Sequence, residues 1–213
     1  MLSIKGHYGP EYRINDPGGG VIGSALRTGQ PYEAKVLYHI FRQGFKGTAI
    51  DVGAHIGNHT LWFALACGLK VYAFEPLEYR ALMDNLQINS LNGNDGSVRA
   101  WPVALGDRAG RAGAVGKGTL ESREIDGSDT VPVCVLDDFH LSDDISLMKI
   151  DVEGWEPQVL RGARETITKN RPVIYAEARD KKAHARNEKV LKELEYKHTR
   201  TYGATPLEEW CPQ

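Results

Sequence analysis

The chain has 213 residues, and its 26 Lys and Arg against 28 Asp and Glu give a formal net charge of −2 at neutral pH. At about 150 residues per domain, this length predicts one domain with a small appendage. Hydrophobic residues at 41% and charged residues at 25% exclude wholesale disorder, and the near-neutral balance gives no electrostatic footprint for general nucleic-acid binding.

Residues 1–30 are predicted to form an irregular lead-in. They hold two short β-like stretches, at 2–5 and 12–15, and a Pro-Gly-Gly-Gly break at 17–20 with no strong helical period. From Pro31 onward, apolar residues recur at helical spacing up to Gly44, with Pro31 in the first turn and Glu33 near the positive end of the helix. We therefore expect a lead-in over 1–30 and a single main domain over 31–213.

Strands and helices are predicted to alternate after this first helix. The expected strands are 48–52, 70–74, 98–105, 147–152, 172–176 and 197–202, and the expected helices are 58–67, 78–91, 156–168 and 185–194. Segment 106–140 breaks the rhythm and predicts a β-hairpin or an extended insert. The alternation predicts an α/β fold: a doubly wound, mainly parallel sheet with helices on both faces.

Cysteine usage and hydropathy predict the compartment. The three cysteines include no C-x-x-C pair and make no disulfide framework, which favours a reducing environment. The longest apolar run, 61–69, is too short to span a bilayer, and the first residues lack the apolar core of a signal peptide. We expect a soluble, cytoplasmic protein with no membrane partner.

The segment TAIDVGAHIGNHT predicts a ligand-binding turn between a strand and a helix. Gly53 and Gly57 let the backbone pass close to a ligand, and Asp51 lies near the carboxyl edge where open α/β sheets bind ligands. The dinucleotide fingerprint G-x-G-x-x-G requires glycine at position 55, and His55 stands there. The turn therefore favours a nucleoside cofactor without phosphates over NAD, and S-adenosylmethionine is the commonest such ligand.

The end of the second strand supports this interpretation. It reads VYAFEP, and a carboxylate at Glu75 can accept hydrogen bonds from both ribose hydroxyls. The structural alternative is that the glycines only form a tight turn and Glu75 is a solvated strand end. The occurrence of both features at this separation favours the cofactor site.

The fourth strand carries unexpected charges in the segment SLMKIDVEGWEPQVLRGA. Lys149, Asp151 and Glu153 alternate, so they lie on one side of an extended backbone. A strand covered by helices on both faces is normally almost wholly apolar. Two carboxylates at its carboxyl end therefore indicate a functional edge.

Five segments together carry a family resemblance: DVGAHIGNHT, FEP, VPVCVLDDF, KIDVEGWEPQVLRGA and RPVIYAEA. In this order, from about residue 32 to 177, they resemble the FkbM-type S-adenosylmethionine-dependent methyltransferases. The resemblance implies a seven-stranded Rossmann-like sheet that ends in an antiparallel hairpin, for which only 197–210 remains. It also implies O-methylation of a hydroxyl on a small molecule or a sugar.

The resemblance further implies a set of cofactor-binding residues. The glycine turn would surround the methionine part, Glu75 would hold the ribose, and Ala104 would lie near the adenine. His55 stands where the family usually carries Asn. The complete set is Glu33, Asp51, Gly53, Ala54, His55, Gly57, Asn58, Glu75, Pro76, Ala104 and Asp151.

Methyl transfer needs alignment of donor and acceptor more than acid–base assistance, but a hydroxyl acceptor gains from a base that removes its proton. Asp151 is the first candidate for a catalytic base and Glu153 the second, while a turn-capping role for Asp151 is the alternative. Asp151, Glu153 and Glu177 would bind Mg²⁺ or Ca²⁺ if they converge, or pair with Lys149 and Arg179 if they do not. The pair His55 and His59 lacks the remaining features of a zinc site, so we predict no metal.

Two classes of function compete with O-methylation of a small molecule or saccharide. One is an N-methyltransferase or nucleic-acid methyltransferase of the same fold, which a basic channel at the strand ends would favour. The other is a module that binds S-adenosylmethionine without catalysis. The acceptor is expected to be selected by residues 1–30 and 106–130, which carry no readable motif.

Overall fold

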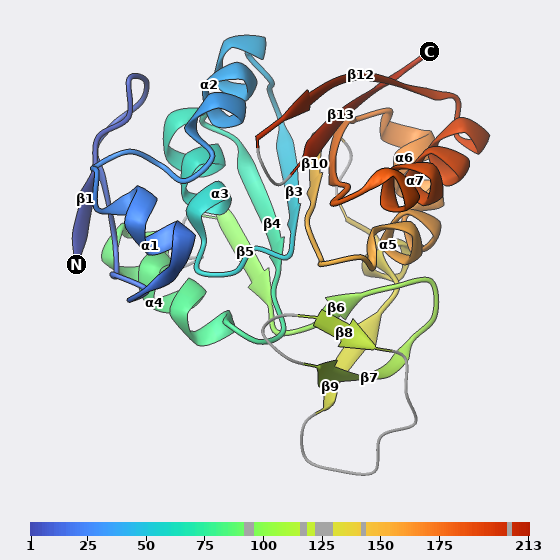
Figure 1. Ribbon diagram of the computed structural model, residues 1–213, viewed down its shortest axis with the longest axis horizontal. Helices are drawn as coiled ribbons and strands as arrows, with labels where there is room; N and C mark the ends of the chain where they lie inside the picture. The colour runs from blue at the N-terminus through green and yellow to red at the C-terminus, as the bar shows by residue number, and fades with distance from the viewer. Residues whose placement is uncertain (92–95, 116–118, 122–129, 142–143, 204–205) are drawn as a thin grey trace.

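The computed structural model describes residues 1–91, 96–115, 119–121, 130–141, 144–203 and 206–213, and its centre is a seven-stranded sheet (Figure 1). The strand order is β12-β13-β11-β10-β3-β4-β5. The strands are β3 (Thr48–Val52), β4 (Lys70–Phe74), β5 (Val98–Trp101), β10 (Ile145–Ile150), β11 (Val173–Glu177), β12 (Tyr196–Tyr202) and β13 (Leu207–Pro212). Strand β13 runs antiparallel to both of its neighbours, β11 and β12, and the other neighbouring strands of this sheet pair in parallel. The predicted doubly wound α/β class is confirmed, and β12 and β13 supply the C-terminal hairpin.

Helices cover both faces of the sheet (Figure 1). The helices on one side are α2 (Ala34–Gln43), α3 (Asn58–Leu61) and α4 (Tyr79–Ile88), and those on the other are α5 (Glu156–Gly162), α6 (Arg164–Asn170) and α7 (Lys181–Glu193). Successive strand residues point to opposite faces, so Ala49 and Leu147 join one apolar core while Ile50 and Met148 join the other. No helix in the described part of the chain is long and apolar enough to cross a membrane.

The lead-in contains one element that the sequence did not predict. Strands β1 (Leu2–Ile4) and β2 (Tyr12–Ile14) pair antiparallel where β-like stretches were expected, but α1 (Gly20–Leu26) follows them. The glycine-rich start hides this helix because glycine lowers helical propensity. Tertiary contacts stabilise it: Leu26 is fully buried, and Arg27 donates to both carboxylate oxygens of Asp16 at 2.7 and 2.8 Å.

The predicted third strand, 98–105, is wrong as a single element. At Pro102, which has no backbone N–H to donate, the chain leaves the main sheet after β5. Strand β6 (Ala104–Leu105) then joins a second, four-stranded sheet of order β6-β9-β7-β8, with β7 (Gly110–Val115), β8 (Thr119–Glu121) and β9 (Thr130–Cys134). This second sheet is the extended insert expected over 106–140, except for 116–118 and 122–129, which lie outside the described residues.

Four helices also depart from their predicted bounds, and one of them, α4, ends at Ile88 rather than at residue 91. The helix expected over 156–168 is interrupted at Ala163, where Gly162 packs so closely on the insert that an added Cβ would lie 2.0 Å from the Gly106 carbonyl oxygen. The helix expected over 58–67 is α-helical only in α3, and its second half, Trp62–Ala66, is π-helical. Helix α7 begins earlier than expected because the Asp180 carboxylate caps it, accepting from the Lys182 and Ala183 backbone N–H groups at 2.8 Å.

Candidate functional site

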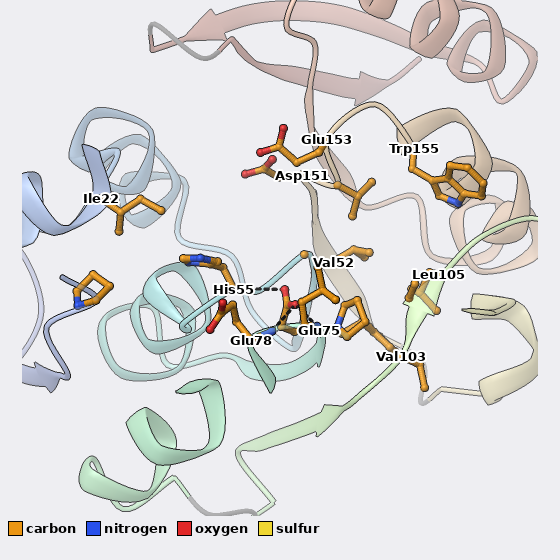
Figure 2. A pocket seen from close by; sticks show the side chains of 17 residues that line it. Ile22, Val52, His55, Glu75, Glu78, Val103, Leu105, Asp151, Glu153 and Trp155 are labelled. Atoms are coloured by element: carbon orange, nitrogen blue, oxygen red, sulfur yellow. Dashed lines mark hydrogen bonds between the residues drawn. The ribbon is translucent and has the colours of Figure 1, made fainter. Parts of the chain in front are cut away.

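The carboxyl ends of β3, β4 and β10 border a cavity of about 720 Å³ (Figure 2). This volume lies within the range typical of small-molecule sites, and the edge is where open α/β sheets bind ligands. Of the residues predicted to bind the cofactor or to catalyse, seven line the cavity: Gly53, His55, Glu75, Pro76, Ala104, Asp151 and Glu153. The other predicted residues lie behind this wall and support it.

The glycine turn is built from residues with left-handed backbone angles. Gly53, His55 and Gly57 have φ angles of 75°, 50° and 93°. A Cβ on Gly53 would lie 1.9 Å from the Asp151 carbonyl oxygen, so only glycine lets the exit of β3 pass the end of β10. A Cβ on Gly57 would lie 2.8 Å from Leu82 Cδ1, so Gly57 serves the packing of α4 against the turn.

Glu75 is held firmly at the end of β4. Its side chain is buried, and Oε1 accepts hydrogen bonds from the backbone N–H groups of Leu77 and Glu78 at 2.7 and 3.0 Å. Oε2 accepts one further bond from the His55 N–H at 2.8 Å (Figure 2). A carboxylate offers about four acceptor positions, so Oε2 retains capacity for a ligand hydroxyl. Glu75 therefore joins the glycine turn to the second strand and still presents an acceptor to the cavity.

Asp51 lies beneath the cavity, in a buried ion pair with Lys149. Lys149 Nζ lies 3.2 Å from Asp51 Oδ1 and donates to the Gly53 carbonyl oxygen at 2.7 Å. Thr60 Oγ1 donates to Asp51 Oδ2 at 2.6 Å. Burial opposes the charge on Lys149, but the carboxylates of Asp51 and Asp151 outweigh it and raise the lysine pKa above its ordinary value. Asp51 therefore acts on the cavity through Lys149 and the turn.

Three other predicted cofactor residues also lie behind the turn. Glu33 lies at the positive, N-terminal end of α2 as expected, although the helix begins only at Ala34. It is the N-cap residue with a left-handed φ of 58°, and its Oε2 lies 3.3 Å from His59 Nε2. Burial would raise the Glu33 pKa, but His59 and Lys149 outweigh it and lower that pKa. Asn58 exchanges two hydrogen bonds of 3.0 Å with the backbone of Tyr32, and Ala54 is buried.

Asp151 and its two neighbouring carboxylates form ion pairs with two different cations. Lys149 Nζ lies 3.7 Å from Asp151 Oδ2, while Arg179 forms ion pairs with Glu153 and, at 3.5 Å, with Glu177. Burial, followed by the charge of Asp151, raises the Glu177 pKa to about 8. Within the described ranges, no group of three or more His, Cys, Asp or Glu side chains has the arrangement of a metal site.

Several lining residues were not predicted from the sequence. Pro17 and Ile22 reach the cavity from the lead-in, and Val103, Leu105 and Trp155 line it near the insert (Figure 2). The position of Trp155 directly after the strand exit offered a signal for its role. Ile22 offered none, because it lies in the helix that the glycine-rich sequence hides.

The order of the strands, the single antiparallel strand and a nucleoside-sized cavity at the carboxyl edge define a Rossmann-like methyltransferase domain. Residues 51–201 match the sequence profile of the FkbM methyltransferase domain. The chain belongs to the FkbM methyltransferase family, and its cofactor is S-adenosylmethionine.

Solved structures agree with this fold. Methyltransferase FkbM from Methylobacillus flagellatus KT superposes with a TM-score of 0.61 at 20% identity, covering 85% of this chain and 48% of that one. Precorrin-6y C5,15-methyltransferase from Geobacter metallireducens GS-15 gives 0.51 at 15% identity, covering 83% and 85%. The N-terminal domain of human METTL16 gives 0.52 at 14% identity, covering 93% and 74%. The chain thus spans about half the length of the Methylobacillus protein. No curated protein sequence matches it.

Replacing Lys149 by Met tests the buried ion pair. The substitution leaves Asp51 buried without its counter-charge, so we expect the free energy of unfolding to fall by about 3–5 kcal/mol in urea titrations. The double variant Lys149→Met/Asp51→Asn should be more stable than Lys149→Met alone, because it removes the uncompensated charge. The exposed Lys70 on β4 provides the control, and Lys70→Met should change stability by less than about 0.5 kcal/mol. If Lys149→Met lost no more stability than Lys70→Met, the result would contradict the assignment of a buried ion pair.

Glu177 predicts a pH dependence of stability. Its carboxyl ionises near 4.5 in the unfolded chain and near 8 in the folded one. The folded state therefore keeps a proton that the unfolded state has lost, and stability should decline as pH rises through this window. In Glu177→Gln the decline between about pH 5 and about pH 8 should be shallower than in the wild type. The free energy of unfolding is measured by urea titration at several pH values. If it declined equally with pH in Glu177→Gln and the wild type, the Glu177 pKa would not be raised.

Proposed function

We propose that this protein is an S-adenosylmethionine-dependent O-methyltransferase that acts on a hydroxyl of a small molecule or sugar. The observation that carries the proposal is that Asp151 and Glu153 line the same cavity as Glu75 and the glycine turn. A ribose-binding carboxylate and a candidate base therefore share one enclosed space. When bound, S-adenosylmethionine supplies an electrophilic methyl group.

The residues of the cavity fit this cofactor. Glu75 Oε2 has acceptor capacity for a ribose hydroxyl, and three backbone N–H groups fix its orientation. Val103, Leu105 and Pro76 offer apolar surface of the kind that an adenine ring contacts. The acidic wall at Asp151 and Glu153 favours a cationic sulfonium electrostatically. We assign the adenosine to the side of Glu75 and Leu105, and the methionine to the side of Gly53.

The chain's own residues provide alignment and a proton acceptor. Asp151 is partly exposed to the cavity and takes the proton of the acceptor hydroxyl as the new bond to oxygen forms. Lys149 lies beneath it and restrains the carboxylate by charge. Because Lys149 also holds the Gly53 carbonyl, one buried ammonium fixes the base relative to the turn. Such fixed alignment can supply about 7–11 kcal/mol of the barrier to a displacement between two bound reactants.

The composition of the cavity wall argues against a nucleic-acid substrate. Four carboxylates, at Glu75, Glu78, Asp151 and Glu153, line it among the described residues, and none of its lining residues is Lys or Arg. A phosphate backbone needs cationic contacts, and the nearest cations, Lys149 and Arg179, are already paired with Asp151 and Glu153. The carboxylates at the strand end equally disfavour a module that binds the cofactor without catalysis.

The substitution Asp151→Asn tests the proposed base. It preserves shape but removes the proton acceptor, so turnover should fall by about 10²–10⁴-fold, the usual contribution of a general base. Turnover is measured as transfer of a labelled methyl group to a panel of hydroxylated compounds, and binding of S-adenosylhomocysteine by calorimetry should change little. Asp84→Asn, on the exposed face of α4, is the control. Near-normal turnover in both Asp151→Asn and Glu153→Gln would contradict base catalysis by this strand end.

A further inference from the structure

A second cavity, of about 640 Å³, lies beside the first. The two cavities adjoin, because they share four lining residues: Pro17, Ile22, His55 and Glu78. In Figure 2, Ile22 and His55 lie on the side of the first cavity away from Trp155 and Leu105. The adenosine assigned to the Glu75 and Leu105 side leaves this second cavity free for another molecule.

Hydrogen bonds and an ion pair hold the outer wall of the second cavity in place. The lead-in is tied to α4 by a hydrogen bond from the Asn15 N–H to Asn85 Oδ1, at 2.7 Å. Next to it, Arg13 exchanges two hydrogen bonds with the Asn89 side chain, at 2.8 and 2.6 Å. Asp16 is engaged by Arg27 and by the Gly18 N–H. The short helix α1 is therefore held at the mouth, where it contributes Val21 and Ile22.

The second cavity contains the Glu78 carboxylate, which only accepts hydrogen bonds when ionised, and the His55 imidazole, which can donate or accept. In the described part of the chain, the Glu78 carboxylate and the His55 imidazole have no side-chain partner, and both line the two cavities. No Lys or Arg is among the residues that line the second cavity. An unpaired carboxylate accepts strong hydrogen bonds from hydroxyl or ammonium donors, and it repels anions. The apolar side chains of Val21, Ile22 and Ala81 offer contact for a C–H face.

We propose that this second cavity is the acceptor subsite, and that it takes a polyhydroxylated, non-anionic molecule such as a sugar or an amino sugar. Glu78 accepts a hydroxyl of the acceptor at the junction, and the acceptor extends from there toward Asp151. Phosphorylated or carboxylated sugars are disfavoured, because the unpaired Glu78 carboxylate lies at the junction. The nearby cations Arg27, Lys149 and Arg179 are already paired with Asp16, Asp151 and Glu153. This inference rests on the proposed function, because it takes the methyl donor and Asp151 as the end of the cavity toward which the acceptor hydroxyl points.

Saturation-transfer NMR on the protein saturated with S-adenosylhomocysteine tests the subsite without relying on turnover. The probes are a panel of methyl glycosides of common hexoses and pentoses, glucosamine, and glucose 6-phosphate. We expect signals from at least one neutral glycoside or from glucosamine, and none from the phosphate. Absence of signal from every non-anionic probe, or a stronger signal from the phosphate, overturns the proposal.

Two substitutions on α1 locate the binding. Val21 is 74% exposed and lines only the second cavity, so Val21→Trp fills the subsite without disturbing the core. It should weaken probe binding at least tenfold, while the dissociation constant of S-adenosylhomocysteine measured by calorimetry stays the same. Ser24→Trp, on the same helix and outside both linings, is the matched control and should retain probe binding. Equal probe binding in Val21→Trp and the wild type overturns the proposal.

A third variant separates this inference from the proposed function. Glu78→Gln should weaken probe binding several-fold, since the amide loses the charge that strengthens hydroxyl contacts. If the probes bind in the subsite but Asp151→Asn leaves methyl transfer unchanged, the proposed catalytic role fails and the subsite stands. If Asp151→Asn abolishes transfer while Val21→Trp leaves probe binding intact, the subsite fails and the proposed function stands.

Discussion

The buried ion pair between Lys149 and Asp51 is the interaction on which the geometry of the cavity depends. The two residues are direct partners in the register of β10 and β3, at the carboxyl edge of the sheet. From this position one ammonium group reaches the Asp51 carboxylate, the Gly53 carbonyl and the Asp151 carboxylate. Taking two charges out of water is costly, so a buried pair is weak evidence for stability as such. Here it fixes the cofactor turn and the candidate base relative to each other.

Around this pair, separate elements divide the remaining tasks. Glu75 ties the end of β4 to the turn through the His55 N–H. The second sheet begins where β6 leaves the main sheet, and its first residues, Ala104 and Leu105, line the cavity beside Trp155. The lead-in closes the opposite side with Pro17 and Ile22. The cofactor side of the cavity is thus formed by the ends of parallel strands, whereas the outer walls come from segments added to the sheet.

Much of the sheet followed from the sequence, because its signals are local. The strands 48–52 and 70–74 were predicted to the residue, since apolar runs between glycines and charged residues mark them clearly. Propensity failed where tertiary contacts decide: α1 forms in a glycine-rich segment because Leu26 is buried, and the helix after β10 is interrupted where Gly162 meets the insert. In the site, Gly53, Glu75 and Asp151 line the cavity. Asp51 and Asn58 are buried behind the cavity wall. The sequence did not predict this, because residue spacing indicates which edge of the sheet a residue lies at but not whether its side chain faces the cavity.

The central claim is that the strand-end cavity holds S-adenosylmethionine through Glu75, and calorimetric titration with S-adenosylhomocysteine tests it most directly. We predict binding by the wild type, no binding of NAD, and an affinity loss of about 1–3 kcal/mol in Glu75→Ala, the range for losing a charged hydrogen-bond partner. Because Glu75 also accepts hydrogen bonds from three backbone N–H groups, Glu75→Ala should lower the free energy of unfolding as well. Urea titrations run in parallel check that the variant is folded under the conditions of the calorimetry. Tight binding of NAD without S-adenosylhomocysteine binding, or an unchanged affinity in Glu75→Ala, would contradict the account.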